Sequence, residues 1–217
     1  MQLFFKTLIL LFAIPLLSQA QRNYKSGYVV NTKGDTLRGF IDYRGWDLSP
    51  HYIRFKTSKD GADQKLTPDD INFFSIDKTT SYRKFTGKIS MDNTSEDHMI
   101  QFRDTSYKFA TVFLKVLQKG KSLALYSYTD AIKTRLYYGE QPEYEPIELV
   151  YRLYYDTDAV TYTHGKTVNE DTYMKQLYNL AVKYDAISLM LQKDIENAGY
   201  RDYYVNEIVK KINKTAK

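Results

Sequence analysis

The chain has 217 residues, no cysteine and a formal net charge of +5, and its 31 basic and 26 acidic residues are interspersed rather than blocked. The lack of cysteine excludes disulfides, thiol catalysis, thiolate metal sites and lipid attachment at a cysteine. Nucleic-acid binding requires a concentrated basic face and a recognisable module, so with interspersed charges we expect no nucleic-acid partner.

Residues 1–20 have the pattern of a secretory signal peptide. Lys6 supplies a positive charge, and the apolar run at 7–17 is shorter than the roughly 20 residues that span a bilayer. Ser18 and Ala20 are the small residues that precede a cleavage site. We predict cleavage between Ala20 and Gln21, which gives an exported protein, periplasmic or secreted, with no membrane span after signal cleavage. A retained membrane anchor is the alternative.

Residues 27–43 predict the β-hairpin that opens the mature protein. The arms are 28–30 and 36–43, and the turn at 31–35 contains a Gly-Asp pair. On the returning arm, Leu37, Gly39, Ile41 and Tyr43 occupy alternate positions, so they share one face of the strand. This hairpin is expected to start a run of antiparallel strands.

Short alternating segments continue along the chain and predict further strands at 51–57, 71–76, 81–90, 99–103, 108–118, 123–129, 132–138 and 147–155. One helical turn is predicted at 66–70, with Thr67 as its cap. Strands at this spacing indicate an antiparallel β meander, a curled sheet or a partly closed barrel. The 21 tyrosines fit the half-buried surfaces of such a sheet.

The hydrophobic period then changes from two to 3.6 residues. A capping box at 167–170 predicts the start of a first helix, Asp185 the cap of a second, and a third begins near Asp202. Because each helix is short, the three should pack on one another or on the sheet. The expected organisation is α+β: a signal peptide at 1–20, a β-rich domain at 21–165 and a C-terminal three-helix segment at 166–217 packed on it.

The polar residues predict no catalytic residue, no cofactor and no metal site. His98 follows two acidic residues, but no spacing holds two metal ligands on one face. Asp69 and Asp70 fit the first turn of a helix better than a catalytic pair, which needs two carboxylates across a cleft. Dinucleotide, phosphate-loop and nucleophile-elbow motifs are missing from the sequence.

Trp46, the single tryptophan, lies in an expected loop between Tyr43 and Tyr52. An exposed aromatic side chain there can stack on a sugar ring or anchor a partner protein. Alternatively, Trp46 folds back and closes one end of the β-rich domain. Trp46, Tyr43 and Tyr52 are the candidate binding residues.

The opening hairpin resembles exported proteins typical of Bacteroidota, whose mature N-termini are similar to G-Y-I-V-x-x-x-G-D-T-x-x-G-x-I-D-Y-R-x-W. The pattern falls on residues 27–30, 34–36, 39, 41–44 and 46. The close of the chain, at Tyr204, Ile208, Val209, Ile212 and Asn213, is also similar to theirs. In some relatives such a domain is followed by an outer-membrane β-barrel. The resemblance implies an envelope location and this fold, and it implies no activity.

The leading hypothesis is therefore an extracytoplasmic, non-catalytic module that binds an envelope protein or polymer. One alternative is a hydrolase of glycan or peptide whose carboxylates the fold brings together. Another is a carrier of a small apolar ligand, with a cavity lined by residues such as Phe113, Leu125 and Tyr151. The sequence leaves the oligomeric state open.

Overall fold

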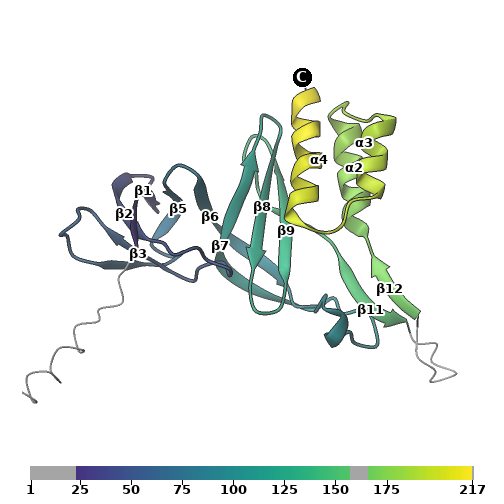
Figure 1. Cartoon of the computed structure of the whole chain (residues 1–217), viewed down its shortest axis with the longest axis horizontal. Helices are drawn as coiled ribbons and strands as arrows, with labels where there is room; N and C mark the ends of the chain where they lie inside the picture. Colours follow the sequence, from purple (N-terminus) through teal and green to yellow (C-terminus); the bar gives the residue numbers. More distant parts are fainter. Residues whose placement is uncertain (1–22, 157–165, 217) are drawn as a thin grey trace, which may run out of the picture.

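The computed structural model describes residues 23–156 and 166–216 (Figure 1). The expected signal peptide, its cleavage site and the turn at His164 lie outside the described residues. Within the described ranges the chain forms a large antiparallel sheet, a separate two-stranded sheet and three C-terminal helices. Figure 1 places the first strands at one end of the molecule and the helices at the other. The α+β prediction is confirmed.

The large sheet contains the strands β1 (Tyr24–Asn31), β2 (Thr36–Asp42), β3 (Ile53–Lys56), β4 (Gln64–Leu66), β5 (Ile71–Ile76), β6 (Thr80–Ser90), β7 (Tyr107–Lys119), β8 (Leu123–Thr129), β9 (Thr134–Glu140) and β10 (Ile147–Leu149). Among the described residues its order is β10-β9-β8-β7-β6-β5-β1-β2-β3-β4. The two short edge strands, β4 and β10, lie at opposite ends of this order and do not pair. The sheet is therefore open, and the expected partly closed barrel is not supported.

The opening hairpin is confirmed. β1 and β2 pair from Tyr24–Asp42 to Val30–Thr36, and the side-chain oxygen of Asn31 holds the turn by accepting two backbone N–H groups. Gly39 faces the neighbouring strand so closely that an added Cβ would lie 2.1 Å from the carbonyl oxygen of Lys56. Only a residue without a side chain lets the two backbones approach in this way.

One face of the sheet carries two apolar clusters. We call the first the N-terminal core; it consists of Val29, Ile41, Ile53, Phe55, Ile71, Phe74, Ile76, Tyr82 and Phe113. The second, the helical core, joins Leu123, Leu125, Leu136 and Leu149 to the apolar faces of the helices. Directly opposed residues share a face, and the register aligns Tyr82, Lys115, Ser127 and Leu136 across β6, β7, β8 and β9. The two cores therefore lie on the same face.

The sheet curls toward its opposite face, so side chains of strands that are not neighbours meet there. The rings of Phe85 in β6 and Tyr137 in β9 lie 5.5 Å apart, although two strands separate β6 from β9 in the sheet. Ser90, at the end of β6, also donates a hydrogen bond to Glu148 in β10. These contacts fit the prediction of a curled sheet.

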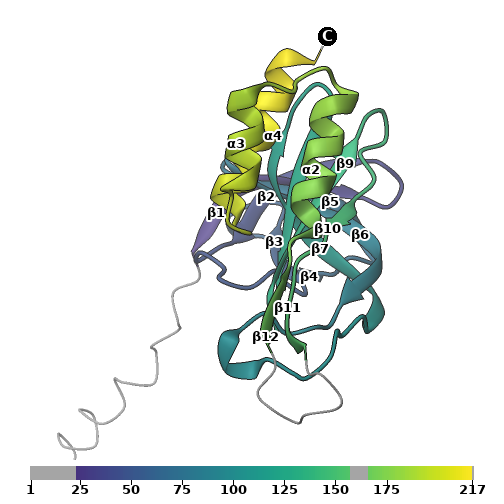
Figure 2. The ribbon, with the colours of Figure 1, turned by 90° about the vertical axis from the view of Figure 1, so that its right-hand side faces the viewer.

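The helices are α2 (Thr172–Lys183), α3 (Leu189–Glu196) and α4 (Asp202–Thr215) (Figure 2). α4 packs on β7 and β8, α2 packs on β10, and the three helices contact one another. The side chain of Asn213 fastens α4 to the β7–β8 turn: its oxygen accepts the N–H groups of Ser122 and Leu123, and its nitrogen donates to the Leu123 carbonyl. None of the helices in the described ranges is long and apolar enough to cross a membrane.

Two predicted helix caps were wrong. The proposed capping box lies in strand β12 (Lys166–Glu170), which pairs with β11 (Arg152–Asp156), because five cross-strand pairs compete with the helix start. Asp185 follows the end of α2 with a positive φ, and Ser188 caps α3 instead by accepting the N–H of Leu191. The helix α4 begins where the sequence predicts it.

Two other local predictions were also wrong. The expected strand at 147–155 is split into β10 and β11, because the side chain of Gln176 accepts the N–H of Val150 and interrupts the ladder. The segment 99–103 makes only an isolated bridge, between Gln101 and Tyr155. The predicted single turn capped by Thr67 is present: the Thr67 carbonyl accepts the N–H groups of Asp70 and Ile71, and its hydroxyl accepts the N–H of Asp69. The Asp70 carboxylate accepts hydrogen bonds from Thr67, which lowers the pKa of Asp70.

Candidate functional site

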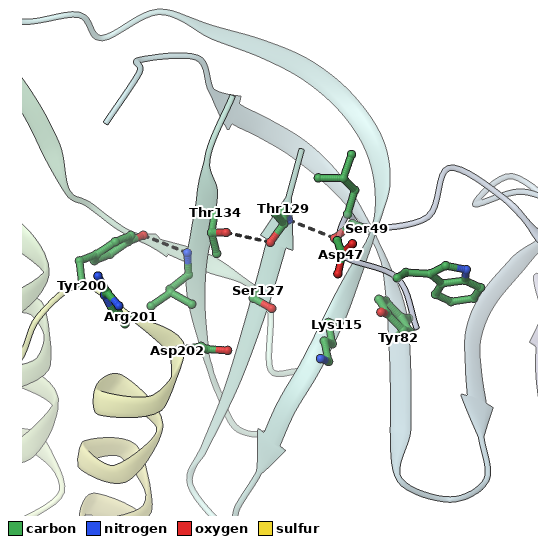
Figure 3. A pocket seen from close by; sticks show the side chains of 13 residues that line it. Asp47, Ser49, Tyr82, Lys115, Ser127, Thr129, Thr134, Tyr200, Arg201 and Asp202 are labelled. Carbon is green, nitrogen blue, oxygen red and sulfur yellow. Dashed lines mark hydrogen bonds between the residues drawn. The ribbon is translucent and has the colours of Figure 1, made fainter. Parts of the chain in front are cut away.

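A polar pocket of about 380 Å³ lies between the N-terminal core and the helical core, on the face of the sheet that they share (Figure 3). Its volume falls in the range of about 300–1,000 Å³ that is typical of ligand sites. The sheet forms its floor, the loop after β2 forms one wall, and the connection between α3 and α4 forms the other. The pocket therefore exists only because residues from three distant parts of the chain meet.

The floor combines a cation with hydroxyl groups. Lys115 in β7 pairs with Ser127 in β8, and Thr129 pairs with Thr134 at the end of β8 and β9. The two threonine hydroxyls lie 2.9 Å apart. Leu136 supplies the apolar part of the floor. These polar floor residues separate the N-terminal core from the helical core on this face of the sheet.

The first wall is held in place by Trp46. Its half-buried ring makes edge contacts with Tyr43, Phe74 and Tyr82, with centroid distances of 4.9, 6.1 and 5.7 Å. Trp46 therefore packs back onto the N-terminal core while lining the edge of the pocket. Ser49 joins the same loop to β8, because it donates its N–H to the Thr129 carbonyl and its hydroxyl accepts the Thr129 N–H. Asp47 and Leu48 lie between Trp46 and Ser49 and line the pocket.

The second wall is fixed by Tyr200. Its hydroxyl accepts the N–H of Leu136 at 2.9 Å and donates to the carbonyl of Leu149 at 2.7 Å, so it bridges β9 and β10 where their pairing ends. Burial raises the pKa of Tyr200. Arg201 and Asp202 follow at the start of α4 and face the pocket. The Asp202 carboxylate accepts the N–H of Tyr203 at 2.8 Å, which engages it in the first turn of its own helix.

The cations of the pocket are not neutralised by the protein. Throughout the described residues, neither Lys115 nor Arg201 forms an ion pair or a side-chain hydrogen bond. Lys115 is half buried, and a charged group withdrawn from water is normally paired. An unpaired lysine on a pocket floor is therefore a candidate ligand-binding group.

A second polar cluster lies on the opposite face of the sheet and has a structural role. The buried Lys133 ammonium pairs with Asp92 at 2.7 Å, and the buried Arg135 pairs with Asp130 at 3.0 Å and donates to the Ser90 carbonyl. Desolvation by burial lowers the pKa of Lys133 although Asp92 opposes the shift. The Lys133–Asp92 pair and the hydrogen bond from Arg135 to Ser90 attach the end of β6 and the segment after it to the start of β9.

Tyr43 and Trp46 are brought together by the structure, and Tyr52 is not. Tyr52 is 41% exposed, its ring lies 4.3 Å from the Lys65 ammonium, and it adjoins the buried Ile53 on the alternating strand segment. Tyr52 therefore faces away from the N-terminal core that Trp46 contacts. Sequence reasoning missed Lys115 and Arg201, since only their meeting in space distinguishes them from other surface cations.

Of the residues proposed for an apolar carrier cavity, Phe113 is separated from the other two. Phe113 packs in the N-terminal core, whereas Leu125 belongs to the helical core. Tyr151 stacks on Tyr200, with ring centroids 5.0 Å apart. Leu125 and Tyr151 both pack in the helical core, whereas Phe113 lies in the N-terminal core. In the part of the chain that the structure describes, no group of three His, Asp or Glu residues is placed to hold a metal ion.

Comparison of the chain with family models, with curated proteins and with solved structures gave no match.

Proposed function

We propose that this protein is an exported, non-catalytic binding module of the cell envelope, and that its pocket binds a polysaccharide. The observation that carries the proposal is the polar pocket between two apolar cores, with an unpaired lysine on its floor. Sugars present many hydroxyl groups, which exchange hydrogen bonds with hydroxyl, ammonium, guanidinium and carboxylate side chains of the kind that line this pocket.

The pocket chemistry favours a polysaccharide over a partner protein. Protein interfaces are anchored by apolar or aromatic side chains that fill desolvated pockets. Here the floor is made largely of Lys115, Ser127 and two threonines, and the Trp46 ring already packs against its own core. A hydroxyl-rich ligand matches this lining, because it satisfies polar groups that an apolar anchor would leave unpaired.

A carboxylate-dependent hydrolase is the second candidate, because Asp47 and Asp202 line the same pocket from opposite walls. A general acid in such chemistry needs an apolar environment that keeps it protonated. Both side chains are exposed, and Asp202 is engaged by the first turn of α4. The binding role therefore has the better support.

The test is a sedimentation assay with purified envelope polysaccharides and peptidoglycan, using the mature chain and two variants. Ser127→Tyr places a large side chain on the pocket floor. Thr86→Tyr, on the same face in β6 but outside the pocket, is the matched control. We expect the wild type and Thr86→Tyr to bind and Ser127→Tyr to lose binding while its thermal unfolding remains cooperative. Binding that survives in Ser127→Tyr would contradict the proposed site, and product release from the polymer would favour the hydrolase.

A further inference from the structure

We infer that the pocket selects acidic polysaccharides, with a carboxylate of a uronic acid residue seated on Lys115; this inference rests on the proposed function. The starting observation is the position of the charges. Lys115 is the single charged side chain of the pocket floor among the described residues, whereas Asp47, Arg201 and Asp202 stand on the walls. The charged group that a ligand meets on the floor is therefore a cation.

The groups beside Lys115 complete a carboxylate site. Ser127 is its direct cross-strand partner and shares its face, and the Ser127 hydroxyl makes no hydrogen bond within the described chain. An ammonium and a hydroxyl on adjacent strands provide donors for the two oxygens of one carboxylate. Because Lys115 is half buried between two apolar cores, water screens this pair less than it screens a surface pair.

The two aspartates on the walls do not neutralise the cations of the pocket. Neither Asp47 nor Asp202 forms an ion pair with Lys115 or Arg201, and the Asp202 carboxylate accepts the N–H of Tyr203. Arg201, on the wall opposite Asp47, remains available as a second cation for an acidic polymer that crosses the pocket. A neutral glycan would leave both cations without a counter-charge.

The experiment compares tetrasaccharides of galacturonate and of mannuronate with their carboxyl-reduced, neutral counterparts by titration calorimetry. Lys115→Met removes the charge and retains the length of the side chain. Lys84→Met is the control, since Lys84 is also half buried and on the same face but does not line the pocket. Thermal unfolding shows whether each variant is folded.

We expect at least one acidic tetrasaccharide to bind more tightly than its neutral counterpart, and added salt to weaken it. Lys115→Met should weaken acidic binding by about tenfold to a hundredfold, the loss of one charge-assisted hydrogen bond, and should weaken neutral binding much less, because a hydrogen bond to a neutral hydroxyl is weaker. Lys84→Met should change neither. Equal binding of acidic and neutral forms, or no effect of Lys115→Met, would overturn the inference.

The proposed function can fail separately. If every acidic tetrasaccharide fails to bind while an envelope polysaccharide still sediments with the wild type and not with Ser127→Tyr, the inference falls and the proposed function stands. If an acidic peptide binds on Lys115 in place of any sugar, both fall. If the polymer assay finds no pocket-dependent binding, the proposed function falls whatever the tetrasaccharides do.

Discussion

The hydroxyl of Tyr200 is expected to hold the second wall of the pocket to the sheet, and Tyr200→Phe tests this. The substitution keeps the ring, which stacks on Tyr151, and removes only the bridge between the Leu136 N–H and the Leu149 carbonyl. A buried backbone group that loses its partner costs about 1–3 kcal/mol. Tyr200 is only half buried and lines the pocket, so water can approach the two backbone groups that it leaves. We therefore expect a cost at the lower end of the range for two such groups, about 2–3 kcal/mol.

The assay is urea unfolding followed by circular dichroism, with the free energy obtained by linear extrapolation. Tyr203→Phe is the control, because Tyr203 is 68% exposed and a surface change of this kind costs less than about 0.5 kcal/mol. The amide of Leu136 should also exchange its hydrogen faster in Tyr200→Phe. A free energy of unfolding within about 0.5 kcal/mol of the wild type would refute the bridging role.

Three further predictions concern the sheet, the helix anchor and a surface carboxylate. Gly39→Ala should destabilise the protein by about 1–3 kcal/mol, since its Cβ would meet the Phe55 ring at 2.7 Å, and thermal unfolding measures this. Asn213→Ala should lower the free energy of unfolding in urea by about 2 kcal/mol, because it removes the hydrogen bonds between α4 and the β7–β8 turn. Glu170→Gln should cost about 1 kcal/mol at pH 7, and this difference should disappear in acid, as urea unfolding at several pH values will show.

The sign of the pH effect follows from the partners of Glu170. The hydrogen bonds from the Arg103 guanidinium, at 2.6 and 2.7 Å, lower the pKa of Glu170 below its ordinary value of 4.5. A lowered pKa contributes stability above the unfolded-state pKa, and this contribution is lost as the pH falls through the folded-state pKa. A difference between wild type and Glu170→Gln that grows toward acid pH would contradict this assignment.

Two control substitutions show whether the losses of stability in Gly39→Ala and Asn213→Ala are specific to those sites. Gly199→Ala places its Cβ in ordinary contact, 3.7 Å from the Tyr204 ring, and should be nearly neutral. Asn179→Ala removes an exposed asparagine from α2 and should likewise change little. If Gly199→Ala destabilises the protein as much as Gly39→Ala does, the close approach of the strands at Gly39 is not the cause of the destabilisation. If Asn179→Ala lowers the free energy of unfolding as much as Asn213→Ala does, the hydrogen bonds of Asn213 to the β7–β8 turn do not contribute the predicted stability.

Local sequence patterns predicted most of the elements. Alternation with a Gly-Asp turn predicted the β1–β2 hairpin, because side-chain period and turn chemistry act within a few residues. The 3.6-residue period predicted three helices for the same reason. The failures occurred where a distant group competes with the local preference: the capping box at 167–170 became β12 because β11 pairs with it, and the 147–155 strand was divided where Gln176 meets Val150.

Local patterns were thus enough to predict the α+β class, the hairpin that opens the sheet and the helical faces that pack on it. Long-range packing set the rest: the sheet stays open, Trp46 packs beside Tyr43 but not beside Tyr52, and a pocket separates the two cores. Lys115 and Arg201 lie 86 positions apart in the chain. No local pattern relates such residues, because their meeting depends on strand register and on where Tyr200 anchors the α3–α4 connection.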